Sequence, residues 1–422
     1  MRDDGIGSIR RHVNDCLERI DRFEDRIRAF VTFDRSAVLS QVEGRADWFR
    51  NRPLAGITLG VKDIIDALPY PTECGTRFRR STQPVQDAAV VARLKSAGAV
   101  VFGKTVTTEF AYFAPGPTRN PFDLNRTPGG SSSGSAAAVA AGFIDVGLGS
   151  QTAASITRPA SYCGVVGFKP THGRYSLAGV RGLAPSFDTL GFLCRDVPTA
   201  AQVHSVIMAA DRVAEPKAPA RVGVCRTPWW DMAEAATQDA LLKSAVLLSA
   251  GAEVEEVGLD DFVDGVRLQA EIMAFEAAAM ISPDGDVLER DLSPVLMKMI
   301  ELGREMDYAH YQKSLRDAAE LRRRIDTVFE TYDVLVAPAA PGEAPEGLAS
   351  TGDPIFSRLW SLLGLPTITV PGFTGPSGMP VGIQLLARAG QDEALLSHAL
   401  WAEQLLPAPK RWTSVGMEVS DA

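Results

Sequence analysis

The chain has 422 residues, of which 45% are hydrophobic and 23% are charged, with a net charge of -9 and a pI of about 5.3. This composition is that of a globular protein with a large core, built either as one large α/β domain or as two smaller ones. An acidic chain repels the phosphates of nucleic acids, so the charge argues against DNA or RNA as the main partner.

The cysteines and the first residues of the chain indicate the cellular compartment of the protein. Five cysteines are scattered along the chain, and no two form a Cys-x-x-Cys pair. Such a set is typical of a reducing compartment and argues against a disulfide framework or a zinc site. The start, Met1-Arg2-Asp3-Asp4, lacks the apolar segment of a signal peptide, and no apolar run is long enough to cross a membrane. We therefore expect a cytoplasmic protein that contacts no membrane.

The first hundred residues predict alternating helices and strands. Apolar side chains recur at helical spacing between residues 8 and 30, which predicts an amphipathic helix packed on the body of the protein. Short β-branched runs at residues 56–61 and 99–102 predict buried strands, and residues 87–97 between them predict a helix. This rhythm of strand, helix and strand favours parallel pairing in an α/β sheet.

The pattern changes in the middle segment, from about residue 214 to residue 331, where long helices are expected. The elements expected from residue 135 onward are helices at 135–141, 237–249, 261–281, 308–331 and 391–405, and strands at 165–168, 221–225, 253–257, 334–336, 368–370 and 381–386. The basic cluster Arg322-Arg323-Arg324 falls on one of these helices, and we interpret it as a solvated helix face.

Two turns rich in serine and glycine, about twenty residues apart, are the most informative part of the chain. The first reads Gly-Gly-Ser-Ser-Ser-Gly-Ser from Gly129 to Ser135, and the second reads Gly-Ser-Gln-Thr-Ala-Ala-Ser from Gly149 to Ser155. Upstream, Lys62 lies in an apolar run, and no histidine lies among these segments. This combination predicts a hydroxyl nucleophile activated by a lysine, and therefore an amide or ester hydrolase.

Three other motifs fit known patterns less well. Residues 98–105 have the spacing of a phosphate-binding loop, but the bulky apolar residues between the two glycines favour a strand. Residues 130–134 fit the nucleophile elbow of α/β-hydrolases, but a loop precedes them where the elbow needs a strand. Cys163 is a candidate nucleophile, but no acid or lysine lies beside it, and a small buried core thiol is favoured.

The spaced motifs together resemble the amidase signature family. The residues that carry the resemblance are Lys62 in Gly-Val-Lys-Asp, the first serine turn, and Ser155 followed by Arg158-Pro-Ala-Ser161. The run Ser-Ile-Thr-Arg-Pro is similar to the malonamidase branch of that family. The resemblance implies an α/β fold, with a large mixed, mostly parallel twisted β-sheet covered on both faces by α-helices.

The resemblance also implies a single amidase domain over residues 1–422. Its core would be residues 50–205 and 332–405, with an N-terminal helical segment at 1–49 and a variable substrate-access segment at 214–331. Trp229, Trp230 and Tyr308 are candidates for lining the access path, although aromatic residues are more often packing.

The resemblance implies a Ser-Ser-Lys triad in which Ser155 is the nucleophile, Ser131 is the bridging serine and Lys62 is the general base. It further implies a cis peptide bond between Gly130 and Ser131. A lysine accepts a proton only when neutral, and burial favours the neutral form, which fits the apolar neighbours of Lys62. The alternative is a buried structural lysine paired with Asp63 or Asp66.

The amides of Thr152, Ala153, Ala154 and Ser155 are the implied oxyanion hole. Here the chain departs from the family pattern, because Ala153-Ala154 replaces the usual Gly-Gly, and Gln151 stands where many members carry Asp. Two methyl groups narrow the pocket and disfavour positive φ angles, so either the size of the substrate or the oxyanion geometry is affected.

Arg158, with Ser132 and Gly130, is the candidate substrate-binding set. An arginine pairs bidentately with a carboxylate, so Arg158 would orient a short acidic amide. The alternative is a structural arginine that bonds backbone carbonyls or a buried acid.

These observations predict an amidase without cofactor or metal, which hydrolyses a small carboxylate-bearing amide through an acyl-enzyme. We expect it to bind its small-molecule substrate and to contact neither nucleic acid nor membrane. The resemblance to the family implies a homodimer. One alternative is an amidotransferase A-type subunit that releases ammonia from glutamine for a tRNA-dependent partner. Another is a non-catalytic binding protein on the same fold, which the Ala153-Ala154 pair motivates.

Overall fold

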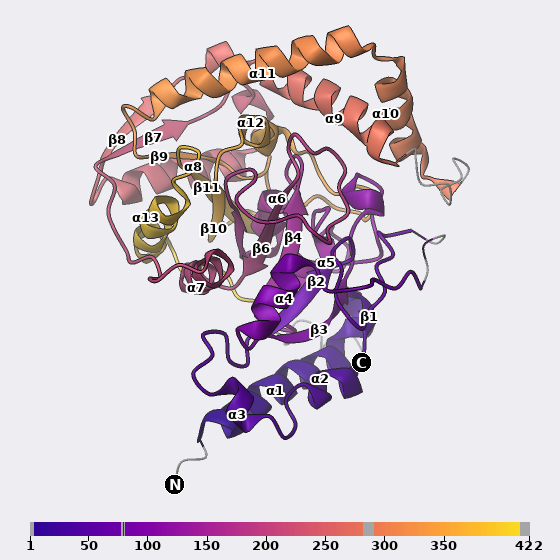
Figure 1. The fold of residues 1–422 in the computed structure, drawn as a ribbon. Coiled ribbons are helices and arrows are strands. Elements are labelled where there is room, and N and C mark those ends of the chain that lie inside the picture. The colour runs from indigo at the N-terminus through magenta and orange to yellow at the C-terminus, as the bar shows by residue number, and fades with distance from the viewer. Residues whose placement is uncertain (1–3, 77–78, 80, 282–290, 414–422) are drawn as a thin grey trace.

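The computed structural model describes residues 4–76, 79, 81–281 and 291–413. One sheet of eleven strands runs through it in the order β1-β3-β2-β4-β6-β5-β10-β11-β9-β7-β8 (Figure 1). The strands are β1 Phe30–Phe33, β2 Thr58–Lys62, β3 Val100–Thr105, β4 Val146–Gln151, β5 Val166–Lys169, β6 Thr189–Cys194, β7 Arg221–Cys225, β8 Glu253–Val257, β9 Val334–Pro338, β10 Thr367–Thr374 and β11 Pro380–Leu386.

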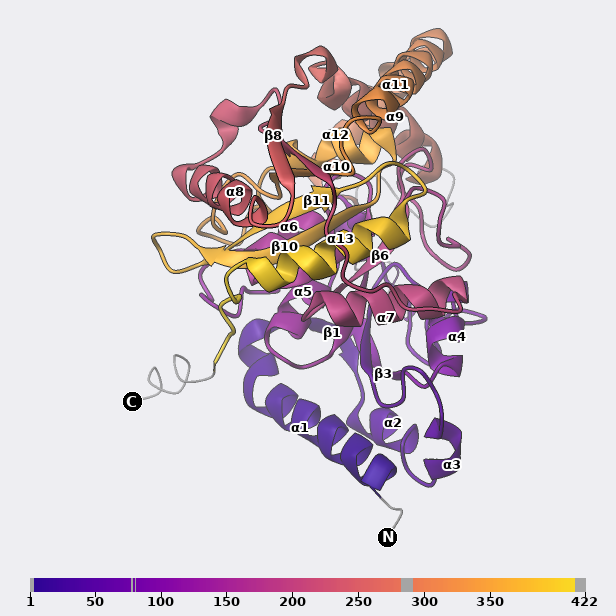
Figure 2. The same ribbon diagram turned by 90° about the vertical axis from the view of Figure 1, so that its left-hand side faces the viewer.

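Helices cover both faces of this sheet. The buried apolar side chains form two main clusters. Helices α1, α5 and α6 pack against the strands in the smaller cluster, and α4, α7 and α13 pack against them in the larger one (Figure 2). The helices are α1 Asp4–Ile27, α2 Arg35–Ser40, α3 Ala46–Phe49, α4 Ala89–Ser96, α5 Ser133–Ala140, α6 Thr157–Cys163, α7 Val197–Met208, α8 Ala235–Leu248, α9 Gly265–Ile281, α10 Pro294–Glu305, α11 Tyr308–Val328, α12 Ile355–Leu363 and α13 Asp392–Leu405. None of the described helices is long and apolar enough to cross a membrane.

The expected fold class, a large mixed α/β sheet between helices, is confirmed, but the sheet is not mostly parallel. Of its ten neighbouring strand pairs within the described ranges, six are antiparallel and four are parallel. The parallel rhythm around β2, α4 and β3 does not extend to the last strands. There β10 and β11 are joined by a short turn, which allows only antiparallel pairing.

Most of the expected elements exist within a few residues of their predicted bounds, and β4 is among those that were missed. β4 alternates glycine with other residues, and its glycines admit α5: a Cβ at Gly147 would lie 2.8 Å from the Cβ of Ser135. Such a strand lacks the β-branched run by which strands are recognised.

The solvated interpretation of the basic cluster on α11 is wrong for one of its three members. Arg322 turns toward α12, where its Nε donates to the carbonyl oxygen of Leu362 at 2.7 Å, while the Arg323 side chain is 75% exposed. The long side chain of Arg322 lets its guanidinium reach the C-terminus of α12 from a partly buried position. The dipole of α12 favours a positive charge at that end.

The sheet brings the two predicted site segments together. β2 ends at Lys62 and β4 ends at Gln151, and these two strands are parallel neighbours, with Val61 opposite Leu148. Because parallel strands end at the same edge of a sheet, the lysine and the second serine turn meet there. The first serine turn leads into α5, which packs on the same strands.

Candidate active site

Lys62 is completely buried and bonds two serine hydroxyls. Its Nζ donates to Ser131 Oγ at 2.6 Å, to Ser150 Oγ at 2.9 Å and to the Ser150 carbonyl oxygen at 3.4 Å. Asp63 is paired with Lys104 instead, at 3.2 Å, and within the described part of the chain Lys62 forms no ion pair. The alternative interpretation, a structural lysine paired with Asp63 or Asp66, is therefore wrong.

Burial lowers the pKa of Lys62 from 10.5 to about 7. The cause is desolvation, since the surrounding protein solvates the ammonium form less well than water does. The negative charge of Asp188 acts in the opposite direction and raises the pKa. At neutral pH a large fraction of Lys62 is therefore the free amine, which can accept a proton.

The turn that carries Ser131 has the backbone that the resemblance implies. The peptide bond between Gly130 and Ser131 is cis. Gly129 has a φ of +82°, and a Cβ there would lie 2.8 Å from the Cα of Pro159, so only glycine fits. The amide of Ser132 donates to the carbonyl oxygen of Ser155 at 3.3 Å, which joins the two serine turns directly.

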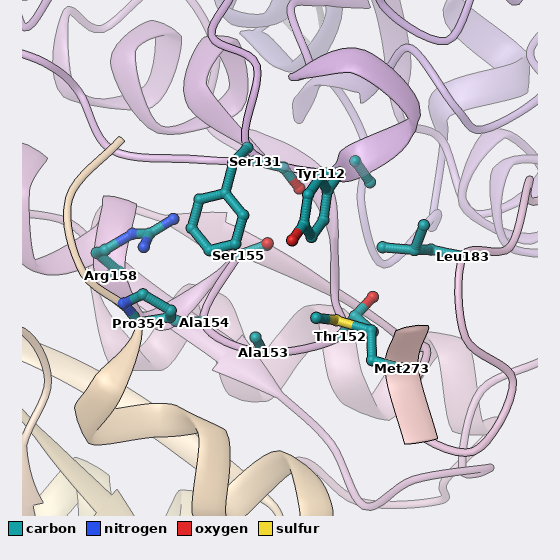
Figure 3. A pocket seen from close by; sticks show the side chains of 12 residues that line it. Tyr112, Ser131, Thr152, Ala153, Ala154, Ser155, Arg158, Leu183, Met273 and Pro354 are labelled. Atoms are coloured by element: carbon teal, nitrogen blue, oxygen red, sulfur yellow. The ribbon is translucent and has the colours of Figure 1, made fainter. Parts of the chain in front are cut away.

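Ser155 lies opposite this turn and shares one pocket with Ser131 (Figure 3). The Ser155 residue is 8% exposed, and its hydroxyl donates to no acceptor in the described part of the chain. A hydroxyl that faces a cavity and has no partner is available to a ligand. Ser131 therefore has the lysine on one side and the shared pocket on the other.

The loop between β4 and α6, residues 152–156, is fixed at both ends by side chains. Thr152 Oγ1 donates to Asp188 Oδ1 at 2.5 Å, and the amides of Leu183 and Ala184 donate to the other oxygen of that carboxylate. Burial raises the pKa of Asp188 to about 6, although these hydrogen bonds lower it. Asp188 was not singled out in the sequence, because a lone aspartate outside a motif carries no signal.

Gln151 takes over a capping role at the start of α6. Its Oε1 accepts hydrogen bonds from the amides of Ile156 and Thr157, at 2.9 and 3.1 Å. These are helix N-terminal donors, which a side-chain oxygen commonly satisfies. The neutral amide thus supplies the acceptor that an aspartate would supply.

The pocket is narrow, with about 20 Å³ open to the centre of a water molecule, which is room for about one or two waters. Its wall combines polar and apolar groups, and it is formed by Ala111, Tyr112, Phe113, Ser131, Thr152, Ala153, Ala154, Ser155, Arg158, Leu183, Met273 and Pro354. Met273 comes from α9, inside the segment expected to shape access. Trp229 and Trp230 instead pack with Phe356, and Tyr308 is 64% exposed, so neither candidate set lines the pocket.

Arg158 lines the pocket but spends most of its hydrogen bonds on the protein. Its Nη1 donates to the Gly352 carbonyl oxygen at 2.5 Å, and its Nη2 donates to the Gly130 carbonyl oxygen at 2.7 Å and to Thr351 Oγ1 at 3.0 Å. Its Nε is buried without a hydrogen-bond partner, and no described carboxylate pairs with it. Burial lowers its pKa to about 10. The arginine therefore braces two backbone segments and brings to the pocket a positive charge that forms no ion pair within the described residues, although the negative charge of Asp353 raises its pKa.

The weaker motifs have structural roles. Lys104, at the end of the phosphate-loop pattern, is a buried residue of β3. The Cys163 thiol is completely buried and donates to the Pro128 carbonyl oxygen at 3.4 Å, and burial raises its pKa. Neither residue lines the pocket.

The fold is thus an eleven-stranded mixed sheet, and a buried lysine and two serine turns meet at one edge of it. A family model described as Amidase matches residues 11–396. The chain belongs to the amidase family.

Individual relatives are similar over nearly their whole length. The A-type subunit of glutamyl-tRNA(Gln) amidotransferase from Roseiflexus castenholzii is 36% identical, over 90% of this chain and 89% of the relative. The peptide amidase of Stenotrophomonas maltophilia has a TM-score of 0.79 at 28% identity, over 95% of this chain and 94% of that one. A chain from a vestigial protein complex linked to the origins of an s-triazine catabolic enzyme has a TM-score of 0.87 at 29% identity, over 96% of both chains.

Proposed function

We propose that this protein is an amidase that uses Ser155 as its nucleophile, with Ser131 and Lys62 as the proton path. The observation that carries the proposal is the 2.6 Å hydrogen bond from a completely buried lysine to Ser131, at a pocket that Ser131 shares with Ser155. A buried amine with a pKa of about 7 is matched to taking a proton at neutral pH.

In the reaction, the Ser155 oxygen forms a bond to the amide carbon, while its proton passes to Ser131 and the Ser131 proton passes to Lys62. The negative charge on the substrate oxygen is stabilised by the amides of the 152–155 loop. The carbon–nitrogen bond then breaks, and the leaving nitrogen takes the proton back along the same path. Water repeats the sequence on the acyl-enzyme and releases the acid.

For the substrate we propose a small amide that bears a carboxylate, in line with the resemblance to the malonamidase branch. The narrow pocket favours a short acyl group, and Arg158 forms no ion pair with a carboxylate of the described residues, while its Nε has no hydrogen-bond partner. A buried charge without an ion-pair partner is costly, and an anionic substrate offsets that cost.

The nucleophile is tested by the variant Ser155→Ala. We expect loss of amide hydrolysis and loss of labelling by a fluorophosphonate, with wild-type folding by circular dichroism. The matched control is Ser244→Ala, which removes another buried hydroxyl, one that donates within α8 to the Leu241 carbonyl oxygen. Unchanged kcat in Ser155→Ala would contradict the proposal. Labelling of Ser155 in the wild type would exclude the non-catalytic binding protein.

The substrate class is tested with short amides, with and without a carboxylate, on the wild type and on Arg158→Lys. We expect the variant to raise KM for the carboxylate amides by about tenfold or more, because a lysine keeps a positive charge but loses the guanidinium donors that the protein leaves unused, Nε among them. The uncharged amides serve as the control, since they make no use of this charge. An equal change for both groups would mean that Arg158 only braces the backbone.

A second candidate function is that of an amidotransferase subunit that releases ammonia from glutamine. It is favoured by relatives named as the A-type subunit of glutamyl-tRNA(Gln) amidotransferase, which are more than 30% identical over most of this chain. Their name includes a tRNA and so counts against the expectation of no nucleic-acid partner, whereas the net charge of -9 counts against direct contact with RNA. Glutaminase activity that requires a co-purifying subunit would support this function, and hydrolysis of small amides by the isolated chain would favour the first.

A further inference from the structure

The loop that carries Ser155 is held from outside by side chains of two helices that are distant in sequence. Gln269 of α9 is completely buried, and its Nε2 donates to the Thr152 carbonyl oxygen at 3.2 Å. Ser361 of α12 is 2% exposed, and its Oγ donates to the Ala153 carbonyl oxygen at 2.7 Å. Two successive peptide carbonyls are thus fixed by side chains 117 and 208 residues further along the chain.

The direction of these carbonyls sets the direction of the amides that follow them. The cis peptide bonds of the described chain lie elsewhere, so the bonds that join Thr152, Ala153 and Ala154 are trans. In a planar trans peptide the C=O and the N–H point in opposite directions. The N–H of Ala153 therefore points away from Gln269, and the N–H of Ala154 points away from Ser361.

These two amides have no partner in the protein. Neither donates to an acceptor within the described ranges, although Ala154 is buried and both residues line the pocket. Buried amides without a partner are rare, because each costs the free energy of a lost hydrogen bond. The two amides lack an acceptor because they face a pocket, where the oxygen of a bound ligand would accept their hydrogen bonds.

We infer that Gln269 and Ser361 are positioning residues that aim the amides of Ala153 and Ala154 at the oxyanion of the reaction. This inference rests on the proposed function. It also accounts for the alanines: neither has a positive φ, so the loop reaches its shape in the region that alanine prefers. A Gly-Gly pair has many backbone states, whereas here the methyl groups restrict the states and the two hydrogen bonds select one of them.

The inference is tested by removing each donor. We expect Ser361→Ala and Gln269→Met each to lower kcat by about tenfold, less than the 10²–10³ that follows removal of an oxyanion donor itself. KM for the same amide should change less than twofold, because the amides act mainly on the developing charge. The rate of fluorophosphonate labelling should fall by the same factor as kcat, since the phosphonyl oxygen occupies the place of the oxyanion.

A control on the same helix separates positioning from packing. Ser357 lies one turn before Ser361, is equally buried, and bonds Thr157 Oγ1 at 2.8 Å instead of the loop. Ser357→Ala should keep the wild-type kcat and labelling rate, whatever it does to the melting temperature. Ser361→Thr keeps the hydroxyl and should recover most of the lost kcat. If Ser361→Ala does not fold, Gln269→Met gives the same readout.

Two results are decisive, and they differ from each other. If Ser155→Ala is inactive while Ser361→Ala and Gln269→Met keep the wild-type kcat and labelling rate, the inference is overturned and the proposed function stands. If Ser155→Ala keeps its activity, the proposed function itself fails.

Discussion

The pH dependence of hydrolysis tests the central feature of the site, which is a lysine that is neutral near pH 7. Burial lowers the pKa of Lys62 from 10.5 to about 7. At pH 7 this change raises its neutral fraction from about 1 in 3,000 to about one half, a gain of about 1,500-fold in competent enzyme. We expect kcat/KM to be flat above about pH 8 and to fall about tenfold per pH unit below about pH 6.

The assay is kcat/KM for an uncharged short amide, because this quantity reports the ionisation of the free enzyme. The rate of fluorophosphonate labelling, measured over the same pH range, should show the same fall at low pH, here called the acid limb. No ionisation of the substrate contributes to this rate. Lys62→Arg should be inactive throughout, because a guanidinium stays protonated.

Asp188 is the group that could produce the same limb, because burial raises its pKa to about 6. Asp188→Asn separates the two. If Lys62 sets the limb, removal of the nearby negative charge lowers the pKa of Lys62 further and moves the limb to lower pH. If the limb disappears in this variant, it belonged to Asp188 and the reasoning about Lys62 is refuted. A limb near pH 10 in the wild type would refute it as well.

Three further predictions concern the rest of the molecule. Gly134→Ala should destabilise the protein by about 3 kcal/mol or more, because its Cβ would lie 2.2 Å from a backbone carbonyl oxygen. Gly7→Ala on α1, whose Cβ would make only an ordinary 3.7 Å contact with the Arg11 side chain, should instead gain about 0.5–1 kcal/mol in urea unfolding. His12 bonds Asp145 at 2.7 Å, and its pKa is raised from 6.5 to about 10. Its stabilising contribution is therefore present below about pH 6.5 and is lost as the pH rises to about 10, so His12→Gln should flatten the fall of the melting temperature over that window. The five cysteines are buried, Cys163 among them, so iodoacetamide should leave the native enzyme unlabelled and active; rapid labelling with loss of activity would contradict this.

The sequence predicted the candidate site because the parts of that site are local motifs. Lys62 stands in an apolar run, and each serine turn is a compact glycine-rich motif, so their meeting at one edge of the sheet follows once β2 and β4 are parallel neighbours. The same locality explains the predicted helices and hydrophobic strands. It also explains the error about parallel pairing, since strand order depends on contacts between segments far apart in the chain.

The residues that sequence reasoning missed act through such distant contacts. Ser150 bonds Lys62 only because its strand lies beside β2, and Asp188, which directly precedes β6, reaches Thr152 only because β6 lies beside β4. Gln269 and Ser361 lie on helices without a motif, and a single polar residue in an apolar helix gives no indication of what it faces. Only the fold shows which polar side chains surround the loop that carries Ser155.

The buried lysine that we propose as the general base should also weaken the fold, and this can be measured. In the unfolded chain Lys62 has its ordinary pKa of 10.5, whereas in the folded chain the pKa is about 7. Between these values the unfolded state binds more protons, so stability rises with pH from about 7 to 10.5, and the penalty is fully present below pH 7. A difference of this size corresponds to at most about 5 kcal/mol. Lys62→Met, which fills the same volume without a charge, should therefore be inactive yet more resistant to urea at pH 7, with an advantage that shrinks toward pH 10. A variant that is less stable at every pH would show that the hydrogen bonds from Lys62 to Ser131 and Ser150 outweigh the cost of its burial.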